Sequence, residues 1–253
     1  MNVKRFVESY GSLVFPNREL RAIPLHMPIQ HERHSEASRF GIAFNIAFDY
    51  ELYRRGWIQD YEPRIDPMVS MTKATLSVLS RIAAKKSLTG RDLCELSYHE
   101  NLVRFNGNWA TYLEFKNQNY TVEDIENMDR DIPIIASEIE RFLSTLNPDD
   151  RLIRNPKFGN DLVDVHGDGD FVLNDTLFEI KCVSDLNIDV KTQKQLMVYK
   201  LIHDMDGAYK PYEIRRFGYF NPLKGQIHVW EASISVGIMR QWGEYVAKLS
   251  KTS

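Results

Sequence analysis

The chain has few of the features that mark secreted, membrane-spanning or disulfide-linked proteins. Its only cysteines are Cys94 and Cys182, so the sequence predicts no disulfide framework and no CxxC metal pair. No apolar run approaches the roughly 20 residues that span a bilayer, and the opening MNVKRFVESYGSLVF is too charged for a signal peptide. These absences predict a reduced, soluble, cytoplasmic protein with no membrane partner.

An excess of positive charge is also missing. The net charge is −3; residues 1–150 carry 18 Lys and Arg against 22 Asp and Glu, and the remainder carries 14 against 13. A nucleic-acid substrate would therefore have to be held by a local basic patch and bound cations. Walker A, GxSxG and GxGxxG motifs are absent, so the sequence carries no visible ATPase, serine-hydrolase or dinucleotide-binding signature.

What is present is an ordinary globular composition, with 43% apolar and 26% charged residues. The length allows one large domain or two modest ones. Apolar residues at helical spacing predict a long buried helix within 35–57, and further helices around 69–84, 91–104 and 122–147. The tract 105–120 fits a loop, a strand or a helix.

After Pro148 the pattern changes to the alternation of strands. LVDVHG, DGDFVL and TLFEIKCV predict three short strands. They are followed by a helix at 191–205, strands at 213–220 and 226–232, and a last helix at 235–249. The expected fold class is therefore α/β (α+β), a mixed β-sheet flanked by helices. We expect a mostly helical region, residues 1–121, packed on a core of residues 122–253.

The segment HGDGDFVLNDTLFEIKC, residues 166–182, predicts a β-hairpin. Asn174 and Asp175 tolerate a positive φ and would form its turn. A four-residue loop keeps the same strand pairing, whereas a three-residue loop breaks it. Because side chains alternate across a strand, one face of this hairpin is apolar and points toward a core; it consists of Phe171, Leu173, Phe178, Ile180 and Cys182.

The other face of the hairpin carries charges. The register places Asp170 opposite Glu179 and Asp168 opposite Lys181. Opposed Cβ atoms lie about 4.5–5.5 Å apart, and two carboxylates at that distance repel unless a cation lies between them or one is protonated. Hard oxygen ligands suit Mg²⁺ or Mn²⁺. The alternative is a solvated hairpin face with Asp168 and Lys181 as a surface ion pair.

Together with NPKFG (155–159) and QLMVY (195–199), this run resembles the PD-(D/E)XK nuclease superfamily. Within it the chain is most similar to the RecB-like branch, whose pattern is an Asp on one strand, (D/E)-x-K on the next and Q-x-x-x-Y on the following helix. The resemblance covers roughly residues 122–232 and implies an αβββαβ core. Asp170 is preceded by Gly169 and not by the proline of the strict Pro-Asp dipeptide, as is common in RecB-like members.

The resemblance implies roles for the charged residues of the hairpin. Asp170 and Glu179 would ligate the metal, and the carbonyl of Ile180 would complete the protein ligands. Lys181 would position or deprotonate the attacking water. Asp168 would either ligate a second metal or hold Lys181 in place, and we favour the second role.

The following helix contributes a second pair of candidates. Gln195 and Tyr199 are four residues apart and share one helical face. The resemblance implies that they lie near the active site and contact the DNA strand. The alternative is an amphipathic helix that presents these side chains to its neighbours.

RecB-like proteins usually add a Glu or a His from an upstream helix. In PIIASEIERFLSTL, Glu138 falls within the apolar stripe and Glu140 lies nearly opposite, so Glu138 is the expected residue. The stretch Gly41–Asn45 competes with it, because it resembles the family's Gly-x-x-x-His helix with Asn45 in place of His. His31 and His34, in a proline-flanked loop, are expected to be surface residues.

The sequence therefore predicts a Mg²⁺- or Mn²⁺-dependent deoxyribonuclease that acts on DNA in repair, recombination or phage defence. Any helicase or ATPase would be a separate partner, and an oligomer is left open. One alternative is a non-catalytic DNA- or protein-binding module of the same fold within a larger complex. Another is a metal-dependent nuclease that acts on RNA. The sequence does not separate endonuclease from exonuclease.

Overall fold

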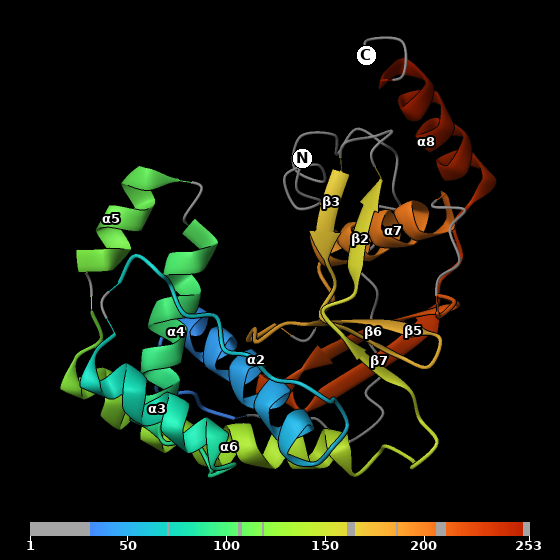
Figure 1. The fold of residues 1–253 in the computed structure, drawn as a ribbon. Coiled ribbons are helices and arrows are strands. Elements are labelled where there is room, and N and C mark those ends of the chain that lie inside the picture. The colour runs from blue at the N-terminus through green and yellow to red at the C-terminus, as the bar shows by residue number, and fades with distance from the viewer. Residues whose placement is uncertain are drawn as a thin grey trace. The chain divides into compact units, whose positions relative to one another are not determined.

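The computed structural model (Figure 1) describes residues 31–69, 71–105, 108–117, 119–160, 165–185, 187–205 and 211–249. These residues form two compact units, a helical unit up to residue 146 and a sheet unit from residue 147. The expected division lay after residue 121. The units divide later because the helix that begins at residue 122 packs with the helices before it.

The helical unit confirms the helices expected from apolar spacing. In the first of them Phe40, Phe44 and Phe48 recur every four residues and are all fully buried. The open tract 105–120 contains a short helix. The helices are α2 (Ala37–Arg54), α3 (Lys73–Ala83), α4 (Gly90–Phe105), α5 (Trp109–Asn117) and α6 (Val122–Leu143).

Helix α6 belongs to the helical unit through its apolar stripe. It begins with a capping box, in which the Thr121 hydroxyl accepts from the Asp124 N–H (3.2 Å) and the Asp124 carboxylate accepts from the Thr121 N–H (2.7 Å). Near its other end, Phe142 meets Phe48 of α2 edge-on, with ring centroids 5.1 Å apart. This stripe is why α6 joins α2 and α4 rather than the sheet.

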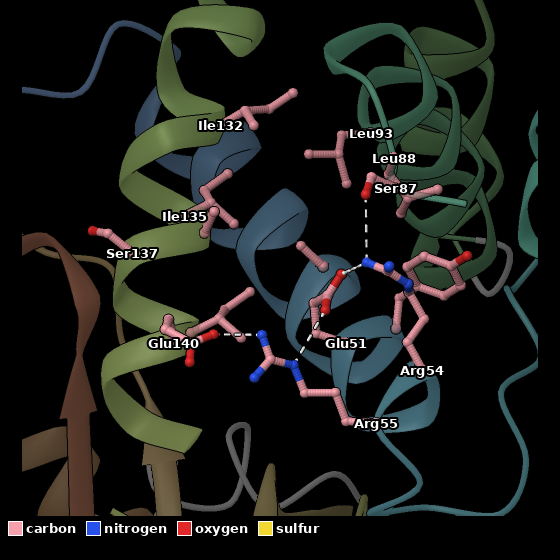
Figure 2. A pocket seen from close by; sticks show the side chains of 14 residues that line it. Glu51, Arg54, Arg55, Ser87, Leu88, Leu93, Ile132, Ile135, Ser137 and Glu140 are labelled. Carbon is pink, nitrogen blue, oxygen red and sulfur yellow. Dashed lines mark hydrogen bonds and ion pairs between the residues drawn. The ribbon is translucent and has the colours of Figure 1, made fainter. Parts of the chain in front are cut away.

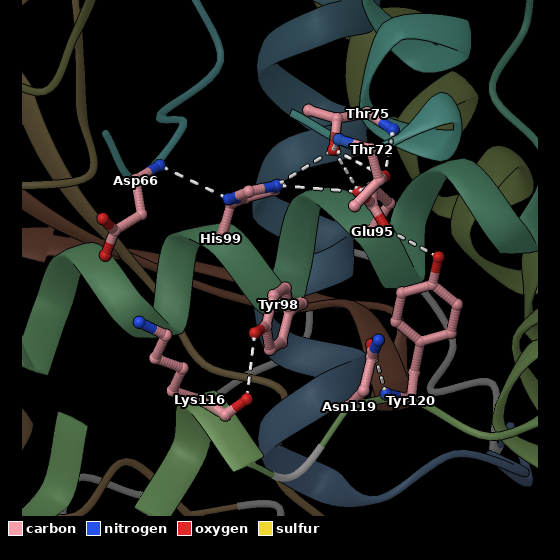
Figure 3. Close-up of polar contacts among 9 residues, drawn as sticks. All are labelled: Asp66, Thr72, Thr75, Glu95, Tyr98, His99, Lys116, Asn119 and Tyr120. Atoms are coloured by element: carbon pink, nitrogen blue, oxygen red, sulfur yellow. Dashed lines mark hydrogen bonds and ion pairs between the residues drawn. The ribbon is translucent and has the colours of Figure 1, made fainter. Parts of the chain in front are cut away.

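A buried polar network joins α3 and α4 (Figure 3). Glu95 is 5% exposed. One carboxylate oxygen accepts from the hydroxyls of Thr75 (2.5 Å) and Thr72 (3.2 Å), and the other accepts from the hydroxyl of Tyr120 (2.6 Å). His99, one helical turn further on, places its Nε2 3.6 Å from the same carboxylate. A buried charge is tolerated here because donors surround it.

The sheet unit contains a five-stranded sheet in the order β1-β4-β5-β6-β7 and a separate antiparallel pair, β2-β3. Strands β5 and β6 are parallel, and the other neighbours are antiparallel. The strands are β1 (Leu152–Arg154), β2 (Lys157–Asn160), β3 (Val165–Asp168), β4 (Phe171–Leu173), β5 (Thr176–Ile180), β6 (Arg216–Asn221) and β7 (Gln226–Glu231). Parallel strands need a crossover, which α7 (Val190–Met205) provides; α8 (Val236–Leu249) follows β7.

Both faces of the central strands are covered. Helix α7 packs on one face, where Leu196 and Ile202 join Val172, Leu177 and Phe217 in a single core. The opposite face carries Phe171 and Phe178, whose rings are stacked with centroids 4.6 Å apart. All five residues of β5 are buried. The apolar face is as expected, but the face that was expected to carry charges also carries the core residues Val172 and Leu177 beneath α7.

The structure confirms the coarse fold class, a mixed sheet with helices. The expected helix at 191–205 and the strands near 213–220 and 226–232 are present, and their ends agree to within three residues. Strands β1 and β2 were not expected, and the segment LVDVHG lies partly outside the described residues. No helix in the described ranges combines the length and apolarity needed to cross a membrane.

The Glu95 network should make stability depend on acid pH. Burial alone would raise the pKa of Glu95, but the hydrogen bonds it accepts outweigh burial and lower the pKa to about 2. A depressed folded-state pKa contributes stability that is present above the unfolded value near 4.5 and is lost as the pH falls toward 2. Urea titrations between pH 6 and pH 2 should show a loss of up to about 3 kcal/mol from this group.

Glu95→Gln should show a correspondingly flatter pH dependence than the wild type. The matched control is Glu62→Gln, which changes an exposed carboxylate and should keep the wild-type profile. Equal slopes for Glu95→Gln and the wild type would contradict the role given to this network.

Candidate active site

The β4–β5 hairpin has the register expected from the sequence. Asn174 adopts the left-handed conformation at φ 56°, and the ladder pairs Phe171 with Phe178. One further step along this register brings Asp170, just before β4, beside Glu179. The Asp170 carboxylate accepts a hydrogen bond from the N–H of Ile180 (2.6 Å). Two acids therefore converge at the carboxyl end of β5.

The expected pairing of Asp168 with Lys181 is wrong. The hairpin pairing ends before Gly169. An added Cβ at this glycine would lie 3.0 Å from the side chains of Leu177 and Phe158. Strand β3 pairs with β2 and does not extend the hairpin. Its last residue, Asp168, is half-exposed and forms an ion pair with Lys157 at 2.6 Å.

Glu179 is the buried carboxylate of the site, and its neighbours hold it in place. It is 3% exposed, and its Oε1 accepts from the Lys181 ammonium (2.6 Å) and from the Gln195 amide (3.1 Å). The backbone of Lys181 is fixed too, since its N–H donates to the carbonyl of Phe220 (2.9 Å). A buried carboxylate needs such partners, and here they come from the segment after β5 and from α7.

Lys181 carries a positive charge at neutral pH. Burial lowers the pKa of its ammonium, but the nearby carboxylates of Glu179 and Asp170 outweigh burial, and the net direction is upward from the usual value. Two carboxylates and one ammonium give this cluster a net charge of −1 when all three groups are ionised, so a divalent cation is electrostatically favoured beside them.

Gln195 and Tyr199 of α7 point into the unit. They are 3% and 2% exposed, and the Gln195 amide reaches both Glu179 and the Tyr199 hydroxyl (3.0 Å). That hydroxyl donates to the carbonyl of Asp168 (2.7 Å). Burial raises the pKa of Tyr199, so its phenol stays neutral. This chain of hydrogen bonds favours a positioning role for the pair over the strand contact that the resemblance implied.

Sequence reasoning missed a polar row that crosses the sheet. Glu179 is paired with Tyr219 on β6, and Tyr219 with His228 on β7. Paired residues share a face, and this is the face that α7 covers, because Leu177 and Phe217, two residues earlier, lie in the α7 core. Tyr219 is fully buried and His228 is 4% exposed. The face therefore turns from apolar to polar within one pleat.

A second polar pair, Asn221 and Gln226, closes the end of β6 and β7. The Asn221 amide donates to the carbonyls of Val183 (2.9 Å) and Asp185 (3.2 Å). These two hydrogen bonds fix the position of the segment after Lys181. The alternation of polar residues in QIHVWE marks one face of a strand. Nothing in the sequence places that face in register with Glu179, since the link is the parallel β5–β6 pairing.

The expected upstream residue, Glu138, lies in α6 of the helical unit. It is 1% exposed; one oxygen contacts Nε2 of His31 (2.8 Å) and the other lies 3.1 Å from the guanidinium of Arg141. His31 is thus a half-buried partner of Glu138 rather than the surface residue expected, whereas His34 is exposed. The competing Asn45 lies on α2 in the same unit and is half-buried.

The donor set in the sheet unit suits a hard cation that keeps most of its water. Within the described ranges no cluster of three or more His, Cys, Asp or Glu side chains is placed to hold a metal ion. Asp170 and Glu179 supply two carboxylates at the carboxyl end of β5, and Mg²⁺ is commonly held by one or two carboxylates with waters and substrate phosphates.

Comparisons of the chain with protein-family models, curated proteins and solved structures found no match. What the site does must therefore be inferred from its residues.

Removing the Tyr199 hydroxyl should destabilise the sheet unit. Tyr199→Phe keeps the ring, which stacks on Phe158 at 4.7 Å, but it leaves the Asp168 carbonyl and the Gln195 amide each short of one partner. We expect a loss of about 1–3 kcal/mol of unfolding free energy in urea titrations. Tyr212→Phe, on a half-buried ring in the same unit, is the control and should change stability by less. Equal losses would argue against the hydrogen-bond chain.

Proposed function

We propose that this protein is a metal-dependent nuclease that hydrolyses phosphodiester bonds in DNA. The observation that carries the proposal is the convergence of Asp170, Glu179 and Lys181 at the carboxyl end of β5, next to the parallel strand β6. Open α/β sheets bind their ligands at the carboxyl ends of parallel strands. A pair of acids with a lysine at that edge supports phosphate chemistry better than a solvated hairpin face, because Glu179 is buried.

The metal would be held by Asp170 and Glu179, with the carbonyl of Ile180 as the remaining protein ligand that the resemblance implies. A bound Mg²⁺ or Mn²⁺ would polarise the phosphate of the substrate and lower the pKa of a water molecule bound to the metal. Asp168, turned toward Lys157, is not needed as a ligand in this proposal.

The chain's own residues provide orientation and charge. Lys181 remains an ammonium and supplies positive charge for the phosphate oxygens that become more negative during cleavage. Gln195 holds the Glu179 carboxylate, and the Ile180 N–H holds that of Asp170. Preorganised groups of this kind contribute to catalysis because they need little rearrangement during the reaction.

A non-catalytic DNA- or protein-binding module is the second candidate. The ion pair between Lys181 and Glu179 at 2.6 Å favours it, because that pair is satisfied without a cation. Such a module would bind DNA or protein in EDTA and would not cleave. Cleavage of RNA in preference to DNA would redirect the proposal to a ribonuclease.

The cleavage assay should show a metal-dependent reaction that needs all three side chains. Single- and double-stranded DNA and RNA are incubated with Mg²⁺, Mn²⁺ or EDTA. Asp170→Asn, Glu179→Gln and Lys181→Met each keep the side-chain shape and should lower the rate about 100-fold or more, because each removes a charge that acts on the transition state. EDTA should abolish cleavage.

Asp204→Asn is the control for these variants. Asp204 is on α7 of the same unit, 43% exposed and paired with Lys200, and its variant should cleave at the wild-type rate. Circular dichroism confirms that each variant is folded. Cleavage that persists both in EDTA and in the Glu179→Gln variant would contradict the assignment of a metal-dependent nuclease to this site.

Asp168→Asn should show whether Asp168 is a metal ligand. Its carboxylate pairs with exposed Lys157, and only its backbone carbonyl contacts Tyr199. The variant should therefore keep the rate within about threefold and leave the Mg²⁺ concentration for half-maximal rate unchanged, since exposed ion pairs contribute little. A loss as large as that of Glu179→Gln would instead identify Asp168 as a metal ligand.

A further inference from the structure

A pocket lies in the helical unit, and none of the residues of the proposed nuclease site lines it (Figure 2). Its walls are α2 and α6, and the turn that leads into α4 closes a third side. Its volume is about 520 Å³, within the range of small-molecule sites. All the residues that line the pocket belong to this one compact unit.

One end of the pocket is apolar. Leu88, Leu93, Ile132 and Ile135 gather there in Figure 2. Leu93 and Ile135 are 2% and 3% exposed, which fixes them as part of the core of the unit. Leu88 and Ile132 are half-buried, so they provide the apolar surface from which a ligand would displace water, at about 25 cal/mol per Å².

The other end is charged. Arg54 and Arg55 come from the last turn of α2, and Glu51 from the turn before it. The Arg54 guanidinium bonds to Glu51 (2.5 Å), to the hydroxyl of Ser87 (3.5 Å) and to the carbonyl of Lys85 (3.1 Å). Its position is therefore fixed from three directions.

Arg55 spans the pocket. Its guanidinium reaches Glu140 on α6 and lies 3.6 Å from the second oxygen of Glu51. Arg55 and Glu140 are 43% and 60% exposed, so the pair between them contributes little to stability. Figure 2 shows both residues at the charged end, on opposite walls.

These contacts decide the sign of the charge that the pocket accepts. Glu51 is engaged by both arginines, so a cation would have to compete with two guanidinium groups for it. Glu140 is mostly exposed and turns into solvent at little cost. An anion can therefore take the place of Glu140 on Arg55, with Arg54 beside it. Guanidinium groups bind carboxylates and phosphates through paired hydrogen bonds.

We propose that this pocket binds a small amphipathic anion, a molecule with an apolar body and one carboxylate or phosphate end. The body would lie against Leu93, Ile132 and Ile135, and the anionic end would bind Arg55 and Arg54. The proposal is independent of the nuclease activity, because none of these residues belongs to that site.

The experiment uses the full chain and simple probes in isothermal titration calorimetry. Decanoate and decyl phosphate carry the proposed chemistry with the two different ends, and the tighter of them identifies the preferred end. Decanol has the body without the charge, decyltrimethylammonium has the opposite charge, and butyrate has the charge without the body. We expect decanoate or decyl phosphate to bind at least about 10-fold more tightly than each of these three probes.

Two variants that break the same ion pair give the decisive comparison. Arg55→Gln removes the group that binds the anion and should weaken binding about 10-fold. Glu140→Gln removes the competing carboxylate and should strengthen binding by about two- to fivefold. A merely structural effect of losing the pair would shift both variants in the same direction. Circular dichroism shows that both are folded.

Three results would overturn the proposal. The first is decanol binding as tightly as decanoate and decyl phosphate, which would indicate an unspecific apolar surface. The second is a weakening of binding by both variants. The third is no heat of binding for either anion at millimolar concentration.

Discussion

A buried carboxylate, that of Glu179, sets the requirements that the sheet unit meets. An ionised side chain that is 3% exposed must be given an opposite charge and hydrogen-bond donors, or it destabilises the fold by several kcal/mol. Lys181 supplies the charge and Gln195 the donor. The helix that carries Gln195 must therefore lie over the end of β5, and the crossover from β5 to its parallel neighbour β6 places it there.

The same crossover explains why the polar residues lie where they do. Helix α7 seals the sheet with Leu196 and Ile202 over Leu177 and Phe217, and one pleat further the face becomes polar with Glu179 and its neighbours. Apolar packing thus ends where the parallel strands end. The hydroxyl of Tyr199 marks the boundary, since its ring packs in the core and its oxygen bonds the Asp168 carbonyl.

How much the sequence could predict depends on the range of the interaction. The β4–β5 register followed from local facts, the alternation of side chains and a turn residue, Asn174, that accepts a positive φ. At Gly169, where β3 no longer follows the hairpin, an added Cβ would meet Phe158 and Leu177 at 3.0 Å, a tertiary contact that no local pattern reveals. Tyr219 joined the row only through parallel pairing with a distant strand. Likewise the stripe of α6 showed that one face is buried, but not that α2 and α4 bury it.

Two buried glutamates show why burial alone does not identify a functional site. Glu95 is surrounded mainly by neutral hydroxyl donors and the ring of His99, a closed arrangement that needs nothing further. Glu179 has a second carboxylate, Asp170, brought beside it by the hairpin register. This like-charged neighbour does not stabilise the fold, and an apolar side chain at position 170 would stabilise it at least as well. Local conflicts of this kind concentrate at functional sites, which is why the hairpin, and not the Glu95 network, is the place to look for chemistry.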